Sequence, residues 1–185
     1  HAEDQFIPSK PLILTEAQQV CLNKIINAIR EPNQSRPILL HGITGSGKTE
    51  VYLQAISSVI ERDQTALVLV PEISLTPQTV ARFKRRFAHI QNQVAVLHSH
   101  LSGGERFDEW HKIVDENAKI VIGARSALFA PLKNLGLIVV DEEHEGSYKQ
   151  DKSPRYHARD VAVVRSKMEG CVVVLGSATP SLESI

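Results

Sequence analysis

One segment of eight residues limits what this chain can fold into more than any other part of its sequence. It consists of Gly42, Ile43, Thr44, Gly45, Ser46, Gly47, Lys48 and Thr49 and matches the pattern G-x-x-x-x-G-K-[ST]. An apolar run at 38–40 precedes it, so the pattern predicts a strand, a glycine-rich loop and a helix that starts near Lys48. Backbone amides in such a loop can turn toward phosphate oxygens, and the helix N-terminus adds partial positive charge. We therefore expect all eight residues to bind a nucleotide, with Lys48 at the terminal phosphates and Thr49 holding Mg²⁺.

Short β-branched runs alternate with helical periodicity along the rest of the chain. Strands are predicted at 37–41, 66–70, 94–98, 119–123, 137–141 and 171–175, and helices at 15–30, 77–87, 102–114 and 158–168. Thr76 followed by Pro77 is a helix start, and Ser102 with Glu105 has the spacing of a capping box. The alternation predicts an α/β fold with a largely parallel sheet and helices on both faces. The 185 residues suit a single domain.

Two adjacent carboxylates, Asp141 and Glu142, follow a continuous apolar run. In an open parallel sheet the carboxyl ends of the strands meet at one edge, where the phosphate loop also opens. Asp141 is therefore a candidate Mg²⁺ ligand, and Glu142 is a candidate for orienting the attacking water. The simpler alternative for Glu142 is a solvated acid after a strand. No Asn-Lys-x-Asp segment is present, which favours ATP over GTP.

Composition excludes several classes of protein. With 42% hydrophobic and 23% charged residues, the chain is expected to be globular rather than disordered. Its apolar runs are far shorter than the roughly 20 residues of a membrane helix, so we expect no membrane partner and a cytoplasmic location. Cys21 and Cys171 lie far apart, which excludes a disulfide framework and a multi-cysteine metal site. Lys plus Arg and Asp plus Glu number 21 each, so net charge gives no support for a nucleic-acid partner, although a neutral protein can carry a locally basic groove.

Motifs beyond the phosphate loop carry a family resemblance. Asp141, Glu142, Glu143 and His144 form a DExH box, and the Gly-Ser-Ala-Thr segment at 176–179 follows the next predicted strand. Together with the phosphate loop, these segments resemble motifs I, II and III of the superfamily 2 helicases, which have RecA-like P-loop NTPase domains. Longer strings at 45–52, 70–76, 122–131, 141–150 and 155–162 resemble the PriA-type primosomal replication-restart helicases. This resemblance extends from about Leu14 to Ile185.

The resemblance implies a 3′-to-5′ DNA helicase that acts at stalled or repaired forks and restarts replication through primosome assembly. Its cofactors would be ATP and Mg²⁺. Its partners would be single-stranded and forked DNA and, through the full-length protein, primosome and replication-restart proteins. Residues 14–185 would form the first RecA-like domain, which binds ATP, and residues 1–13 a leader or linker. The family's N-terminal DNA-binding region, second RecA-like domain and zinc region are expected to be absent, and the two cysteines here cannot hold that zinc.

The resemblance also implies roles for individual residues. The catalytic residues would be Lys48, Asp141, Glu142 and His144. Gln18 would contact the adenine edge, but Thr15 and Gln18 also have the spacing of a capping box, which is a purely structural alternative. His144 would couple the nucleotide state to Ser177 and Thr179.

DNA contacts are expected from two sets of residues, because helicases bind mostly the DNA backbone and can stack an aromatic side chain on a base. The first set is Pro71, Glu72, Gly123, Arg125 and Ser126. The second set lies in the loop after the DExH box and is Tyr148, Lys149, Arg155 and Tyr156. Some relatives place a tryptophan in this loop, where this chain has Lys-Ser-Pro at 152–154. We expect the loop at 143–156 to be mobile. Another basic cluster, Arg82, Lys84, Arg85 and Arg86, is better explained as a solvated helix face than as a DNA contact.

The isolated chain is expected to bind ATP and hydrolyse it poorly, because an arginine supplied by a second domain can contribute several orders of magnitude in rate. Two other functions share part of the pattern. One is a P-loop ATPase or kinase that acts on a substrate other than nucleic acid, although such an enzyme has no reason to carry His144 or the string at 122–131. The other is a non-catalytic module that docks DNA or protein partners and uses nucleotide as a switch. Substitution of Arg125 and Tyr148 would separate the helicase from both.

Overall fold

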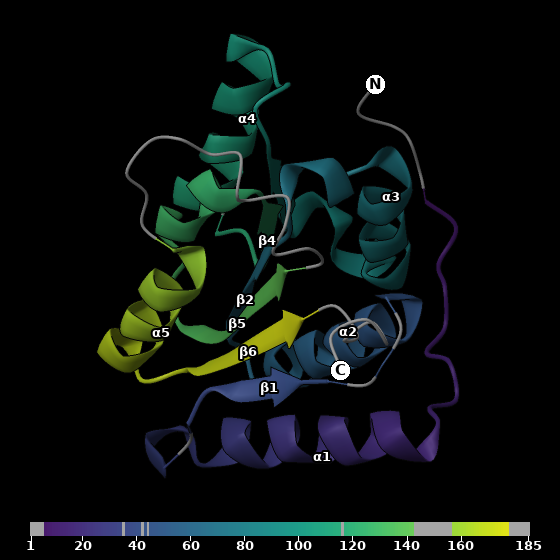
Figure 1. The fold of residues 1–185 in the computed structure, drawn as a ribbon. Helices are drawn as coiled ribbons and strands as arrows, with labels where there is room; N and C mark the ends of the chain where they lie inside the picture. Colours follow the sequence, from purple (N-terminus) through teal and green to yellow (C-terminus); the bar gives the residue numbers. More distant parts are fainter. Residues whose placement is uncertain are drawn as a thin grey trace.

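A six-stranded sheet, parallel throughout, organises the computed structural model, which describes residues 6–34, 36–41, 43, 45–115, 117–142 and 157–177. The strands are β1 (Ile38–Leu40), β2 (Thr65–Leu69), β3 (Val94–Leu97), β4 (Ile120–Gly123), β5 (Leu135–Glu142) and β6 (Val172–Ser177), in the spatial order β1-β6-β5-β2-β4-β3 (Figure 1). All six predicted strands are present, and the predicted α/β class with a parallel sheet is confirmed. Strand β5 is longer than predicted because Leu135 pairs with Thr65 next to a register shift, a pairing that depends on the neighbouring strand.

Helices cover both faces of this sheet, as the sequence predicts. They are α1 (Glu16–Arg30), α2 (Gly45–Glu61), α3 (Pro77–Arg86), α4 (Gly103–Val114) and α5 (Ala158–Glu169). Side chains that alternate along each strand separate into two buried clusters: Ala66 and Val68 pack with α1, α2 and α3, whereas Leu67 and Leu69 pack with α4 and α5. In Figure 1, α3 and α5 accordingly lie on opposite sides of the strands.

Local signals set the helix starts. The capping box at Ser102 and the Thr76 cap followed by Pro77 both form as predicted. Helix α2 differs from the prediction because it begins at Gly45 instead of near Lys48, so the loop glycines 45 and 47 belong to its first turn. Short 3₁₀ helices, η1 (Pro32–Gln34), η2 (Glu72–Ser74), η3 (Ala88–Gln93) and η4 (Arg125–Phe129), complete the described elements.

The strand register brings the carboxyl ends of the strands to one edge. Leu40 and Asp141 both pair with Gly176, so β1, β6 and β5 end level with one another. On the other half of the sheet, Leu69 pairs with Gly123, so β2 and β4 also end together. The carboxyl ends of β1, β5 and β6 therefore lie at one half of this edge, and those of β2 and β4 lie at the other. Within the described parts of the chain, no helix combines the length and apolar character needed to cross a bilayer.

Candidate functional site

The phosphate-loop lysine and the strand aspartate meet at this edge. Lys48 lies in the first turn of α2 with only 2% of its surface exposed, and its Nζ is 3.0 Å from Oδ1 of Asp141. The same Nζ donates to the backbone carbonyl of Ser177 at 3.1 Å. Lys48 and Asp141 are 93 residues apart in sequence, and the order β1-β6-β5 brings them together. A lysine is rarely this buried without a partner. Here the partner is Asp141, the residue predicted to bind the Mg²⁺ of the nucleotide that Lys48 is predicted to contact.

Tyr52 is a further member of this cluster that the sequence analysis did not identify. It lies four residues after Lys48 on α2, is 2% exposed, and donates from its hydroxyl to Oδ1 of Asp141 at 2.8 Å. A Cβ atom at Gly176, the residue that pairs with Asp141 on β6, would collide with the Tyr52 hydroxyl. Its position four residues after Lys48, which places both on one face of the predicted helix, was the sequence signal for it.

The donor set suits Mg²⁺ bound together with phosphates. Among the described residues, no group of three or more His, Cys, Asp or Glu side chains could hold a metal by itself. Mg²⁺ usually keeps several waters and takes one or two carboxylates plus substrate phosphates. A single aspartate, Asp141, together with Thr49, which follows Lys48 in the sequence, fits this ion. Both hydrogen bonds that the described residues give to Asp141 end on Oδ1, which leaves Oδ2 for such a ligand role. Thr49 is half-buried in the first turn of α2.

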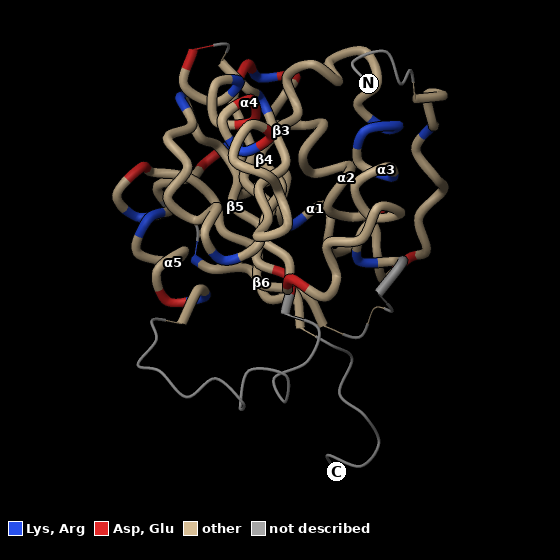
Figure 2. The backbone as a smooth tube through the Cα atoms, turned by 90° about the horizontal axis from the view of Figure 1, so that it is seen from above, with Lys and Arg blue, Asp and Glu red and all other residues tan. Residues whose placement is uncertain are grey.

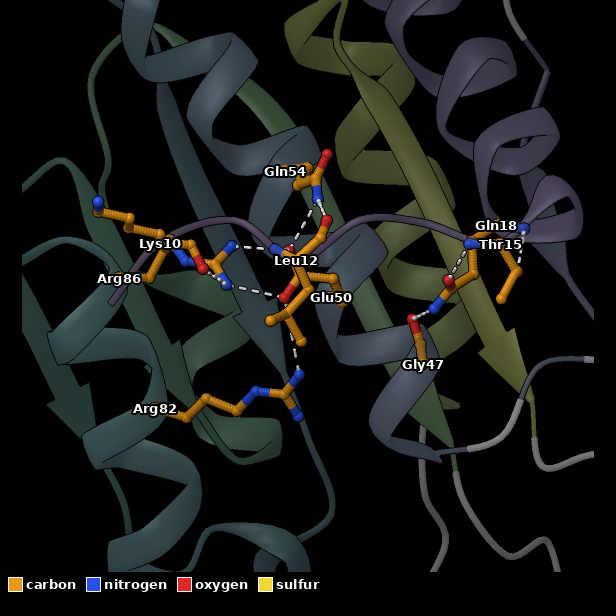
Figure 3. Close-up of polar contacts among 9 residues, drawn as sticks. All are labelled: Lys10, Leu12, Thr15, Gln18, Gly47, Glu50, Gln54, Arg82 and Arg86. Carbon is orange, nitrogen blue, oxygen red and sulfur yellow. Dashed lines mark hydrogen bonds and ion pairs between the residues drawn. The ribbon is translucent and has the colours of Figure 1, made fainter. Parts of the chain in front are cut away.

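Gln18 forms the predicted capping box and also contacts the first turn of α2. The capping box is present: Gln18 N donates to Thr15 Oγ1 at 3.2 Å, and Thr15 N donates to Gln18 Oε1 at 2.7 Å. The amide nitrogen of the same side chain donates to the carbonyl of Gly47 at 3.0 Å (Figure 3). Gln18 is therefore held against the first turn of the helix that carries Lys48, and the adenine contact stays a prediction.

Ser177 touches two residues of the same edge. Its carbonyl accepts from Lys48, and its hydroxyl is 3.2 Å from Nδ1 of His41, the residue after β1. His41 was not identified from the sequence, which contains no pattern that pairs it with Ser177.

Several predicted site residues lie outside the described residues: Gly42, Thr44, His144, Tyr148, Lys149, Arg155, Tyr156 and Thr179, together with the expected mobile loop at 143–156. Ser46 and Glu142 are described for their backbone only.

The first set of predicted DNA contacts gathers at the other half of the edge. Pro71 and Glu72 follow β2, Gly123 ends β4, and Arg125 and Ser126 lie in the adjoining η4. Ser126 is exposed and Arg125 is half-buried, so both reach the surface. These residues are neighbours in space, although they come from separate stretches of sequence.

Two members of this set also have structural roles. Glu72 Oε1 accepts hydrogen bonds from the backbone N and the hydroxyl of Ser99, at 3.0 and 2.7 Å. A Cβ at Gly123 would lie 2.5 Å from the Cβ of Ala127 and 2.7 Å from the carbonyl oxygen of Leu97, so packing alone requires glycine there.

An ion cluster centred on Glu50 is a third feature that was not identified from the sequence. Glu50 is 2% exposed and receives two hydrogen bonds from Arg86, at 2.7 and 2.9 Å, with Arg82 at 3.9 Å. Gln54 Nε2 and the backbone N of Leu12 also donate to it, which ties the N-terminal segment to α2 (Figure 3). Burial alone would raise the pKa of Glu50, but these hydrogen bonds and the charge of Arg86 outweigh it and lower the pKa below its ordinary value.

The Glu50 cluster corrects the interpretation of the basic residues on α3. The Arg86 side chain is only 6% exposed, so the solvated-face interpretation is wrong for this residue, whereas Arg85 is exposed as expected. Figure 2 shows charges of both signs mixed over α4 and α5. This distribution agrees with the equal numbers of acidic and basic residues in the sequence.

Comparison with known proteins defines the class to which this fold and site belong. Residues 15–185 match the DEAD/DEAH box helicase family, so the chain belongs to that family. It is 53% identical over 184 residues to the replication restart protein PriA of Bacillus subtilis, a match that covers 100% of this chain and 22% of that protein. It is also 57% identical over 148 residues to PriA of Synechocystis, with coverage of 80% and 17%. The PriA-type resemblance predicted from the sequence is confirmed, and the chain spans about a fifth of the length of these curated relatives.

Similarity to solved structures supports the fold. The structure of RecG bound to a three-way DNA junction superposes with a TM-score of 0.63 and 25% sequence identity, covering 97% of this chain and 24% of that chain. The predicted RecA-like fold is thereby confirmed.

Proposed function

We propose that this chain is the ATP-binding motor half of a 3′-to-5′ DNA helicase that acts at stalled or repaired forks in replication restart. The observation that carries this proposal is the juxtaposition of Lys48 and Asp141, at 3.0 Å, on the sheet edge where the phosphate loop opens. The similarity to PriA proteins over the whole chain supports the same role. Residues 14–185 act as the first RecA-like domain, preceded by a leader or linker at 1–13.

Nucleotide binding follows from the groups at the start of α2. The amides of this first turn and Lys48 receive the phosphates, and Lys48 then exchanges its Asp141 carboxylate for phosphate oxygens. Asp141 and Thr49 hold Mg²⁺, which neutralises charge that develops on the phosphates. Glu142, the residue after Asp141, orients the attacking water. Gln18, held beside Gly47, contacts the adenine edge.

The partners are single-stranded and forked DNA and, through the rest of the full-length protein, primosome and replication-restart proteins. The residues at the ends of β2 and β4 bind DNA together with the segment that contains Tyr148, Lys149, Arg155 and Tyr156. Ser177 connects the two activities with His144 and Thr179. Support for this coupling is that Ser177 already contacts Lys48 through its carbonyl and His41 through its hydroxyl.

The first test is binding of a fluorescent ATP analogue by the chain in the presence of Mg²⁺. Lys48→Ala is expected to abolish binding, because the phosphates lose their charged partner. Lys133→Ala is a matched control, since Lys133 is exposed and lies just before β5, at the opposite edge of the sheet. Equal affinities of Lys48→Ala and Lys133→Ala would overturn the proposed site.

Hydrolysis separates binding from catalysis. Glu142→Gln in the full-length protein is expected to keep ATP binding and lose turnover, whereas normal turnover would refute the water-orienting role. The isolated chain is expected to hydrolyse ATP slowly, because an arginine supplied by a second domain can contribute several orders of magnitude in rate. Fast, DNA-stimulated turnover by this chain alone would contradict that expectation.

DNA binding distinguishes the helicase from other P-loop proteins. We would measure affinity for labelled single-stranded and forked DNA with and without Mg²⁺ nucleotide, comparing the chain with an Arg125→Ala/Tyr148→Ala variant. Weaker binding by the variant, and a shift with nucleotide, support a motor that couples its two sites. If the variant binds DNA as the parent chain does while both bind nucleotide, a different ATPase or a nucleotide-switched docking module becomes the better description.

A further inference from the structure

The carboxylate of Asp141 is held by a tyrosine as well as by the phosphate-loop lysine. Oδ1 accepts from Lys48 Nζ at 3.0 Å and from the Tyr52 hydroxyl at 2.8 Å. Lys48 and Tyr52 are one turn apart on α2, so both donors approach Asp141 from the same helix. We propose that Tyr52 is a positioning residue that keeps Asp141 oriented for Mg²⁺ when Lys48 turns away to the nucleotide phosphates. The proposal rests on the nucleotide-binding function proposed above.

The need for such a residue follows from the exchange of Lys48 between two partners. While Lys48 pairs with Asp141, the ammonium group fixes the position of Oδ1. Once phosphates compete for that ammonium group, Asp141 loses its charged donor. The Tyr52 hydroxyl carries no charge and belongs to a buried ring, so the phosphates attract it less than the ammonium group and it can keep Oδ1 in place. Oδ2, on which neither of these two hydrogen bonds ends, would then be the carboxylate oxygen available to the ion.

The neighbouring strand is adapted to this hydroxyl. Gly176 pairs with Asp141 in the register of β5 and β6, and a Cβ at position 176 would collide with the Tyr52 hydroxyl and lie 2.9 Å from Asp141 Oδ1. Glycine normally weakens a strand interior and often marks a close approach of another group. Here the group that approaches is the tyrosine hydroxyl. Three elements, α2, β5 and β6, therefore contribute to one hydrogen bond.

The competing explanation is that the carboxylate merely satisfies a buried phenol. Under that explanation, loss of the hydroxyl changes stability and leaves the response to metal unchanged. Outer-shell partners of metal ligands behave differently, because their loss typically lowers metal affinity by about 10- to 100-fold. The two explanations are separated by the ratio of nucleotide affinities with and without metal, a quantity that packing alone does not alter.

The experiment uses Tyr52→Phe, which keeps the ring and removes only the hydroxyl. Dissociation constants for a fluorescent ADP analogue are measured in excess Mg²⁺ and in EDTA, and Mn²⁺ binding to the nucleotide complex is followed by electron paramagnetic resonance. We expect the gain in affinity on adding Mg²⁺ to fall about tenfold, at the low end of the outer-shell range because the donor is neutral. Affinity in EDTA is expected to change less than twofold.

Thr65→Val is the matched control. It also removes a buried hydroxyl, one that donates to the Lys133 carbonyl at 2.9 Å at the start of β2, away from the site. The gain in nucleotide affinity that Mg²⁺ gives to this variant is expected to equal the gain in the unaltered chain. If Tyr52→Phe retains the full Mg²⁺ gain and the unaltered Mn²⁺ signal, the positioning role is refuted while the proposed function stands. If the unaltered chain binds no nucleotide in either condition, the proposed function itself fails, and the inference falls with it.

Discussion

The ion pair between Glu50 and Arg86 supports a quantitative prediction about stability. Arg86 donates two hydrogen bonds to a carboxylate that is 2% exposed, and it donates a third to the carbonyl of Lys10. Arg86→Ala would leave this buried charge with Gln54, the backbone N of Leu12 and the more distant Arg82 as its remaining partners. Loss of one partner from a buried pair costs about 3–5 kcal/mol, because the other charge remains desolvated. Since these weaker partners persist, we expect Arg86→Ala to lower the free energy of unfolding by about 3 kcal/mol, the lower end of that range.

Urea unfolding of the chain, followed by circular dichroism, measures this loss. With a denaturant slope of about 2 kcal/mol per molar, a loss of 3 kcal/mol lowers the unfolding midpoint by about 1.5 M. Arg85→Ala is the matched control, because Arg85 is exposed and its contact with Ser9 uses only its backbone carbonyl. It is expected to change stability by less than about 0.5 kcal/mol.

A second variant tests whether the cost comes from the stranded charge. Glu50→Gln combined with Arg86→Ala removes the carboxylate charge that Arg86→Ala alone leaves unpaired, so the double variant is expected to be more stable than Arg86→Ala. The reasoning is refuted if Arg86→Ala is as stable as Arg85→Ala. It is also refuted if the double variant is less stable than Arg86→Ala.

Three further predictions concern acid sensitivity, packing and thiol reactivity. Because burial of Glu50 is outweighed by its hydrogen bonds and the arginine charge, its pKa is lowered in the folded state, so its stabilisation is present above the unfolded pKa and is lost as pH falls through the folded value. The urea unfolding midpoint should therefore decrease more between pH 6 and pH 3 for the parent chain than for Glu50→Gln. An equal decrease in both proteins would contradict the assignment. Gly123→Ala should lower the free energy of unfolding by about 1–3 kcal/mol, since the added Cβ would lie 2.5 Å from the Cβ of Ala127. An unchanged melting temperature would show that the strand can shift to accommodate the methyl group. Burial raises the pKa of Cys171 to about 12, so a disulfide reagent at pH 8 should label Cys21 quickly and Cys171 slowly, and loss of the fast phase in Cys171→Ser would reverse this assignment.

Features that depend on neighbours in sequence could be predicted from the sequence. The Thr76 cap with Pro77 and the capping box at Ser102 are formed by side chains within one turn of the backbone they satisfy, so their spacing alone indicates a helix start. Strands β2 to β6 could be recognised because a parallel strand buried on both faces is a continuous apolar run, and β1 is an apolar run as well although Leu39 is exposed. The start of α2 was placed too late, since glycine has low helix propensity and yet Gly45 and Gly47 lie in the first turn of the helix.

The sequence by itself thus determined the α/β class, the phosphate loop and the acid at the end of β5. Only the tertiary structure decided what surrounds them: the strand order β1-β6-β5 sets Lys48 against Asp141 across 93 residues, and the approach of α2 to β6 places the Tyr52 hydroxyl over Gly176. The Glu50 cluster likewise depends on how α2, α3 and the N-terminal segment pack together. The physical reason is that helix and strand patterns repeat with the local backbone geometry, whereas contacts between distant segments depend on which strands become neighbours, and no short-range spacing encodes that order.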